Sequence, residues 1–192
     1  MAVLSFTRQF STVVYRNQFR PMTTSRIAAA LLTALVFVSS SCDKGLEPSN
    51  EPSGFSGVIH FKNWPPPDSV LELRLVAFEK YPSDTASIVE ALFSGEAVLY
   101  PPVGATGFPK FVDSIEYVFD NAGAVIKVTK YDYVVVAWRY GTNFFADWRP
   151  AGVYTTNPGS FDPAPVLVLL HRITPDIDIE VDFYNPPPRP WQ

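Results

Sequence analysis

The stretch Ile177-Asp-Ile-Glu-Val-Asp-Phe-Tyr184 alternates apolar and acidic side chains, and it gives the clearest indication of fold class in the chain. Successive side chains of a β-strand point to opposite faces of a sheet, so a period of two is typical of a strand with one buried face. The side chains expected to point inward are Ile177, Ile179, Val181 and Phe183. Those expected to point outward are Asp176, Asp178, Glu180 and Asp182. This pattern predicts a sheet protein.

Strand patterns recur through the preceding 120 or so residues. Strands are expected at 55–62, 70–79, 111–119, 131–138 and 166–170, and the last two are apolar on both faces, as central strands are. One short helix is expected, with Asp84 as its N-cap and Gly95 as its C-terminal stop. Turns rich in Gly and Pro separate these segments. We therefore predict an all-β sandwich of about seven or eight strands with at most one short helix.

Residues 1–42 have the layout of an export signal. An apolar run from Ile27 to Val38 follows Arg26 and precedes Ser39-Ser40-Ser41-Cys42, which contains the only cysteine. The run is shorter than the roughly 20 residues of a membrane span, and its length suits a signal-peptide core. Two alternatives stay open, an organelle transit peptide and a buried helix that ends in a cysteine. A translation start at Met22 would give a conventional charged beginning.

These features divide the chain into four parts. Residues 1–41 are expected to be the signal region, and 42–54 an anchor followed by an extended linker, because this stretch has little to bury. Residues 55–185 are the expected β-sandwich domain. The tail 186–192 is rich in proline and should be extended, either free or laid over the sandwich.

The segment Ser39-Ser40-Ser41-Cys42 resembles the lipobox of bacterial lipoproteins, which implies lipid attachment at Cys42 and a protein anchored in the bacterial cell envelope. Inner and outer membrane are not distinguished. The mature domain resembles carboxypeptidase regulatory-like and transthyretin-like sandwiches in three stretches: Gly57-Val-Ile-His-Phe61, Leu73-Arg-Leu-Val-Ala-Phe78 and Tyr131-Asp-Tyr-Val-Val-Val136. This resemblance implies an Ig-like or transthyretin-like sandwich that binds or scaffolds rather than catalyses.

The charge of the expected mature protein argues against a nucleic-acid partner. Residues 43–192 hold all 19 acidic residues but only 11 of the 15 basic ones, because Arg8, Arg16, Arg20 and Arg26 precede Cys42. The difference is a net charge of −8, which a phosphate backbone would repel. We therefore expect no nucleic acid as a partner. The lipobox resemblance implies instead a membrane, through the lipid anchor, and an envelope protein or glycan as partners.

Catalytic and metal-binding patterns are weak in this sequence. The only histidines, His60 and His171, fall on different expected strands, and the domain has no Gly-rich phosphate loop and no cysteine nucleophile. We expect no enzyme, no catalytic residue and no cofactor. The acidic row from Asp176 to Asp182 could supply oxygens to Ca²⁺, but its spacing of about 7 Å is wide for one ion. A charged edge strand that prevents aggregation is the favoured interpretation, and no metal site is assigned.

An aromatic cluster surrounds the expected loop 141–152, and it consists of Trp138, Tyr140, Phe144, Phe145, Trp148 and Tyr154. Exposed aromatic faces could stack on a sugar or hold an apolar peptide, whereas buried ones would serve packing. The ligand-binding candidates are Trp138, Tyr140, Trp148 and Tyr154. The leading hypothesis is a non-catalytic envelope lipoprotein that acts as a binding or assembly module. The alternatives are a carbohydrate-binding lipoprotein that uses this loop and an envelope hydrolase or metal-dependent enzyme.

Overall fold

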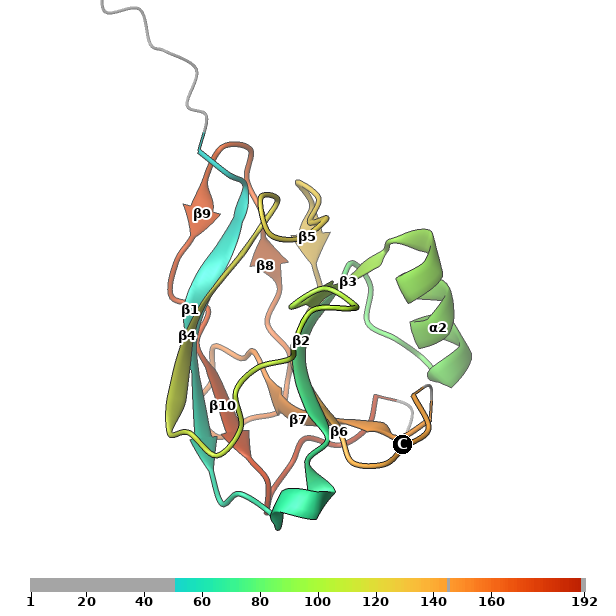
Figure 1. The fold of residues 1–192 in the computed structure, drawn as a ribbon. Helices are drawn as coiled ribbons and strands as arrows, with labels where there is room; N and C mark the ends of the chain where they lie inside the picture. Colours follow the sequence, from blue (N-terminus) through green and yellow to red (C-terminus); the bar gives the residue numbers. More distant parts are fainter. Residues whose placement is uncertain (1–50, 145, 191–192) are drawn as a thin grey trace, which may run out of the picture. The chain divides into compact units, whose positions relative to one another are not determined.

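The computed structural model describes residues 51–190 except residue 145, and Figure 1 shows their arrangement. Several sequence-based expectations lie outside these residues: the signal region, the start at Met22, the lipobox with Cys42, Phe145 and the last two tail residues. Among the described residues the chain is mostly strand with one α-helix, α2 (Thr85–Ser94), and one short 3₁₀ turn, η1 (Pro67–Ser69). The prediction of an all-β fold with one short helix is confirmed.

The first sheet is built around β1 (Gly54–Lys62). It pairs antiparallel with β4 (Ser114–Asp120) on one side and parallel with β10 (Ile179–Asp182) on the other. The short strand β9 (Ile173–Thr174) pairs parallel with the beginning of β1. The alternation predicted for the C-terminal stretch is confirmed, because its four apolar side chains are at most 6% exposed.

The second sheet has the strand order β3-β2-β6-β7. Its members are β3 (Ala97–Tyr100), β2 (Glu72–Phe78), β6 (Tyr133–Arg139) and β7 (Trp148–Val153), and every neighbouring pair is antiparallel. The expectation that 131–138 forms a central strand is confirmed for β6. A bend at Asp132 interrupts the strand, so Tyr131 belongs to a separate short strand. A separate two-stranded sheet joins β5 (Lys130–Tyr131) to β8 (Val166–Leu167).

The main core lies between the first and second sheets. Each sheet contributes the side chains that point toward the other, as the period of two requires. Residues with no exposed surface in this layer include Phe55, Ile59, Leu73, Leu75, Phe119, Val134, Val136, Ile179 and Val181. We call the side of the second sheet that faces this core its inner face.

Gly152 marks a close approach between β7 and β10. A Cβ atom at Gly152 would lie 2.4 Å from the carbonyl oxygen of Glu180, so a larger residue would push the two strands apart. Real Cβ contacts are never that short. The glycine therefore lets the last strand of one sheet pack directly on the last strand of the other and closes one side of the sandwich.

The outer face of the second sheet is covered by α2, which lies on the side of that sheet away from the first sheet (Figure 1). Asp84 accepts a hydrogen bond from the backbone N–H of Ser87 at 2.7 Å, and the Ser87 side chain accepts from the Asp84 backbone N–H in return. Gly95 ends the helix with φ of 74°, a conformation that favours glycine. Both predicted helix caps are confirmed.

Three predictions about local structure are wrong. Residues 166–170 do not form a central strand, because β8 is only two residues long and Leu167, Leu169 and Leu170 are exposed. The expected loop 141–152 ends at Trp148, where β7 begins. The linker ends before residue 54, since Gly54 opens β1 and Ser53 is buried and hydrogen-bonded to Asn121 and His171.

Candidate functional site

Two of the four aromatic candidates belong to the main core. Trp138 is 7% exposed, packs edge-to-face on Phe183 at 5.1 Å between ring centroids, and donates its indole N–H to the carbonyl oxygen of Ser69 at 2.7 Å. Tyr154 is half-buried against the same core. Trp138 therefore stabilises the sandwich from within its core, and Tyr154 packs against that core while it stays partly exposed.

Trp148 lies on the outer face instead. Its register partner is Arg139, and the two side chains stand on the same side of the sheet, opposite to Trp138. Trp148 donates its indole N–H to the Phe144 carbonyl oxygen at 2.6 Å and meets the Phe144 ring edge-to-face at 6.2 Å. The Arg139 guanidinium lies 5.9 Å from the Trp148 ring and 5.8 Å from that of Phe144. The aromatic pair is thus held against the sheet.

A groove of about 510 Å³ runs between α2 and this outer face, and Trp148 and Phe144 form one of its walls. Its floor consists of side chains from β2 and β6, among them Val76, Val135 and Ala137. The helix contributes the opposite wall. The helix, β3 and loop residues that line the groove are Thr85, Ile88, Val89, Leu92, Phe93, Leu99 and Val103.

Arg74 holds one rim of the groove in place. Its guanidinium donates to the carbonyl oxygens of Pro101, Pro102 and Ala105, the last two at 2.8 and 2.9 Å, and to the Glu72 carboxylate. Only 6% of the Arg74 side chain is exposed. Loop 101–105 is therefore tied to the sheet, and it carries Val103 to the groove.

The charged residues along the groove are all basic. Among the described residues that line the groove, only Arg149 and Arg189 have charged side chains, although the domain as a whole is acidic. The Arg149 guanidinium lies 5.4 Å from the Trp138 ring, so it points to the inner side, and its Nε is buried without a hydrogen-bond partner. Arg189 Nη2 donates to the Tyr140 hydroxyl at 3.4 Å. Tyr140 does not line the groove; its ring packs edge-to-face on Trp138 at 6.3 Å, and its hydroxyl meets the groove residue Arg189.

The C-terminal tail supplies Arg189 and Pro190 to the groove. Pro187 is buried, which fixes the tail against the domain two residues before Arg189. Of the two alternatives for this segment, a strip laid over the sandwich holds for residues 186–190.

Burial raises the pKa of the Tyr133 hydroxyl on the groove floor well above its ordinary value.

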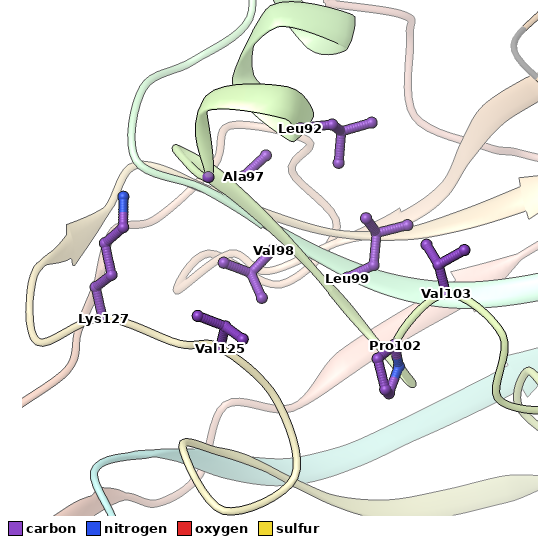
Figure 2. A pocket seen from close by; sticks show the side chains of 9 residues that line it. Leu92, Ala97, Val98, Leu99, Pro102, Val103, Val125 and Lys127 are labelled. Atoms are coloured by element: carbon purple, nitrogen blue, oxygen red, sulfur yellow. The ribbon is translucent and has the colours of Figure 1, made fainter.

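A smaller pocket of about 240 Å³ adjoins the groove along β3 (Figure 2). In Figure 2, Leu92, Leu99 and Val103 lie on one side of β3, and Val125 and Lys127 lie on the other. The first three residues line both cavities. The Lys127 Nζ is paired with Glu79 at 2.8 Å, so its charge is satisfied within the domain.

Three apolar side chains near α2 are unusually exposed. Phe93 is 81% exposed, Val103 67% and Val125 84%. Single exposed apolar residues are common, but a group beside an apolar groove is typical of a binding surface. Phe93 and Val103 line the groove, whereas Val125 lines only the smaller pocket.

The acidic side chains of the last strand are engaged within the domain. Asp178 accepts from the Val58 backbone N–H at 2.7 Å, and Glu180 pairs with Lys62 at 2.7 Å. Asp182 accepts from the Asn63 amide at 2.8 Å, and this hydrogen bond lowers the pKa of its carboxyl group. Across residues 51–190, residue 145 aside, no three His, Cys, Asp or Glu side chains are grouped as metal ligands would be.

The aromatic cluster predicted from the sequence includes the groove residues Trp148 and Phe144 and the neighbouring Tyr140, but most of the other lining residues were missed. The helix, β3 and Val103 were not candidates, because their juxtaposition depends on how α2 packs across the second sheet. One signal was present in the sequence. The outer-face residues Val76 and Phe78 of β2 are as apolar as the inner-face ones, which indicates that something covers that side of the strand.

Comparison with known proteins gives this chain no relative: no family model matches it, and neither does a curated protein or a solved structure. The resemblances drawn from short motifs therefore stay expectations. No helix in the part of the chain that the structure describes is long and apolar enough to cross a membrane.

Proposed function

We propose that this chain is a non-catalytic binding module whose ligand site is the groove between α2 and the outer face of the second sheet. One observation carries the proposal: a cavity of about 510 Å³ with a mostly apolar lining, beside the exposed Phe93 and Val103. Ligand sites in proteins are typically concave, largely apolar and of about 300–1,000 Å³. A ligand in the groove would cover apolar surface that water now contacts.

The groove is built on rigid elements, which supports a preformed site. Strands β2 and β6 provide the floor, and the Arg74 hydrogen bonds hold loop 101–105 at one rim. Trp148 and Phe144 are fixed by a hydrogen bond and by Arg139. A ligand that enters a preformed site loses less affinity to the ordering of the protein.

The groove chemistry favours an apolar ligand over a glycan. Few of its lining side chains carry hydrogen-bonding groups, and the Trp148 N–H already donates to a carbonyl oxygen within the protein. Sugars present many hydroxyl groups, each of which needs a partner when it leaves water. Carbohydrate binding is therefore the second candidate, and an envelope hydrolase the third.

A fluorescence titration with the neutral apolar dye Nile red tests the binding site. We expect the dye to bind the full chain, and the variant Phe93→Ser to weaken this binding at least about threefold, because a ring in contact with the ligand is lost. Phe93 is 81% exposed, so the melting temperature should not change.

Val125→Ser is the matched control, because Val125 is 84% exposed and lies outside the groove. We expect dye binding to be unchanged in this variant. Equal weakening in both variants, or no binding to the unaltered chain, would refute the groove as the ligand site.

We also propose that the module is presented at the bacterial cell envelope by a lipid anchor on Cys42. The support is the order of segments in the sequence: Arg26, the apolar run, three serines and the single cysteine. Mass spectrometry of the N-terminal peptide from host membranes tests this, and an acylated Cys42 at position one is the expected result. An unmodified N-terminus at another residue would contradict it.

A further inference from the structure

We propose that the groove binds a long-chain fatty carboxylate, with the hydrocarbon chain on the apolar floor and the carboxylate at Arg189. The inference rests on the proposed binding function and names its ligand. It combines two separate features of the groove, the apolar lining along the sheet and the basic end formed by the C-terminal tail.

The apolar part of the groove suits an unbranched hydrocarbon chain. Its floor side chains Val76, Val135 and Ala137 come from adjacent strands, and Leu92 and Phe93 of α2 stand across from them. None of these side chains can donate or accept a hydrogen bond, so a methylene chain leaves no polar group without a partner. Each methylene group that leaves water should increase affinity by up to about fourfold.

Arg189 provides the charge complementarity. Its guanidinium donates to the neutral Tyr140 hydroxyl at 3.4 Å, and no carboxylate within residues 51–190 pairs with it. A guanidinium has five N–H donors in a planar fork that matches a carboxylate, and one long hydrogen bond leaves most of them available. Pro187 is buried and restricts where the following residues can go.

Tyr140, which lies outside the groove lining, adds a second donor beside the Arg189 guanidinium. Its oxygen accepts from Arg189, so its own O–H is available to donate. A carboxylate between the two groups could accept from both. This arrangement gives a binding role to one of the aromatic residues that the sequence pattern singled out.

The charge of the surroundings makes this assignment selective. The part of the groove lining that the structure describes includes no Asp, Glu or Lys, and its second arginine, Arg149, is turned toward Trp138. A cationic or zwitterionic head group would find no acidic partner among these lining residues. An anionic head group would find Arg189, in a domain whose net charge otherwise repels anions.

Competition against bound Nile red tests the inference. The full chain carrying Cys42→Ser is used, so that no acyl group can be attached at that position. We expect palmitate to displace the dye, and laurate to bind at least about tenfold more weakly because its chain is shorter. In Arg189→Gln, palmitate affinity should fall about tenfold while 1-hexadecanol affinity stays the same.

Arg172→Gln is the matched control, because it removes the same charge from an exposed position outside the groove. Palmitate affinity should not change in this variant. Equal losses in the two arginine variants would show a general charge effect and overturn the assignment of Arg189.

Failure of this inference can be told apart from failure of the proposed function. If Nile red binds and depends on Phe93 but palmitate does not displace it, the groove remains a binding site and the fatty carboxylate is the wrong ligand. If palmitate binds equally well to Arg189→Gln, the carboxylate is not recognised and the inference is overturned. If Nile red binding does not depend on Phe93, the groove itself is refuted.

Discussion

Replacing Arg74 by methionine should destabilise the domain more than the removal of an exposed charge such as that of Lys62. The Arg74 side chain is 6% exposed and Glu72 beside it 12%, so this ion pair is shielded from water. Methionine keeps the length and apolar character of the side chain but removes every donor. The carbonyl oxygens of Pro101, Pro102 and Ala105 would lose the guanidinium donor, although that of Pro102 keeps a hydrogen bond within the loop, from the Ala105 N–H at 3.0 Å.

The expected loss in the free energy of unfolding depends on which partners Glu72 and the loop carbonyl oxygens keep in Arg74→Met. Removing one partner of a buried ion pair costs about 3–5 kcal/mol, because the other charge is left without compensation. Glu72 keeps Arg139, whose Nε and Nη2 lie 3.0 and 2.9 Å from its carboxylate. Pro102 and Ala105 are exposed, so water can reach their carbonyl oxygens. We therefore expect the low end, a loss of about 3 kcal/mol in the free energy of unfolding.

Urea denaturation followed by tryptophan fluorescence is the assay, with the slope compared between variants so that a change in midpoint reports stability. Lys62→Met is the control, because the Lys62–Glu180 pair is exposed and its removal should leave the midpoint almost unchanged. Arg74→Lys separates charge from geometry. Lysine keeps the charge, but its compact ammonium group cannot donate to three carbonyl oxygens and a carboxylate as the planar guanidinium does. Most of the loss in the free energy of unfolding should therefore remain.

A midpoint for Arg74→Met equal to that of Lys62→Met would refute this reasoning. A second readout links stability to the site. Loop 101–105 carries Val103 to the groove, so releasing the loop should also weaken Nile red binding. Unchanged dye affinity in a destabilised Arg74→Met would show that the loop keeps its place without the hydrogen bonds.

Three further changes test the fold. Asp84→Ala removes the N-cap of α2 and should cost about 1 kcal/mol, seen as a lower melting temperature; no change would mean that the cap is replaced by water. Gly152→Ala should cost about 2–3 kcal/mol in urea denaturation, because β7 and β10 must separate, and a neutral result would contradict the close approach. Burial raises the pKa of Tyr117, Tyr131 and Tyr133, so the native state keeps protons that the unfolded chain releases near pH 10. Stability should therefore be complete below about pH 10 and fall as pH rises above it, and equal urea midpoints at pH 9 and pH 11 would refute this.

The local elements that the sequence predicted well have strong, self-contained signals. In the last strand, charges alternate with apolar residues, so only one register buries the apolar set. The helix has both a capping residue, Asp84, and a glycine at its end, Gly95, and these act within one turn of the backbone. Such signals need no knowledge of the rest of the fold.

The strands that were missed owe their structure to their neighbours. β7 contains Pro150 and Gly152, which weaken a strand pattern, but β7 is an edge strand beside a register shift, where proline is tolerated. β3 is four residues long and is defined by its pairing with β2 from Leu75 to Phe78. Residues 166–170 show the opposite error, since an apolar run carries no information about which face is covered.

The candidate site was predicted in part for the same reason. An aromatic cluster in the sequence does not say which rings point inward, and strand alternation places Trp138 and Trp148 on opposite faces of the second sheet. The direction could be deduced only after the strand boundary and the register of β7 were known. Predicting the groove would also require knowing that α2 packs against residues of β6 and β7, which are distant in the sequence.

The sizes of the floor residues explain why a gap stays open between α2 and the second sheet. Along the outer face of β6 the side chains are Tyr133, Val135, Ala137 and Arg139, and α2 packs on the end where Tyr133 and Val135 lie. Beyond them the side chain of Ala137 is small, and Arg139 is drawn aside to Glu72. The helix therefore cannot close on the sheet along its whole length, and Phe93 stays exposed beside the gap. Removing apolar surface from water is worth about 25 cal/mol per Å². A ligand that fills the gap would therefore bind more tightly for each part of the exposed apolar groove surface that it covers.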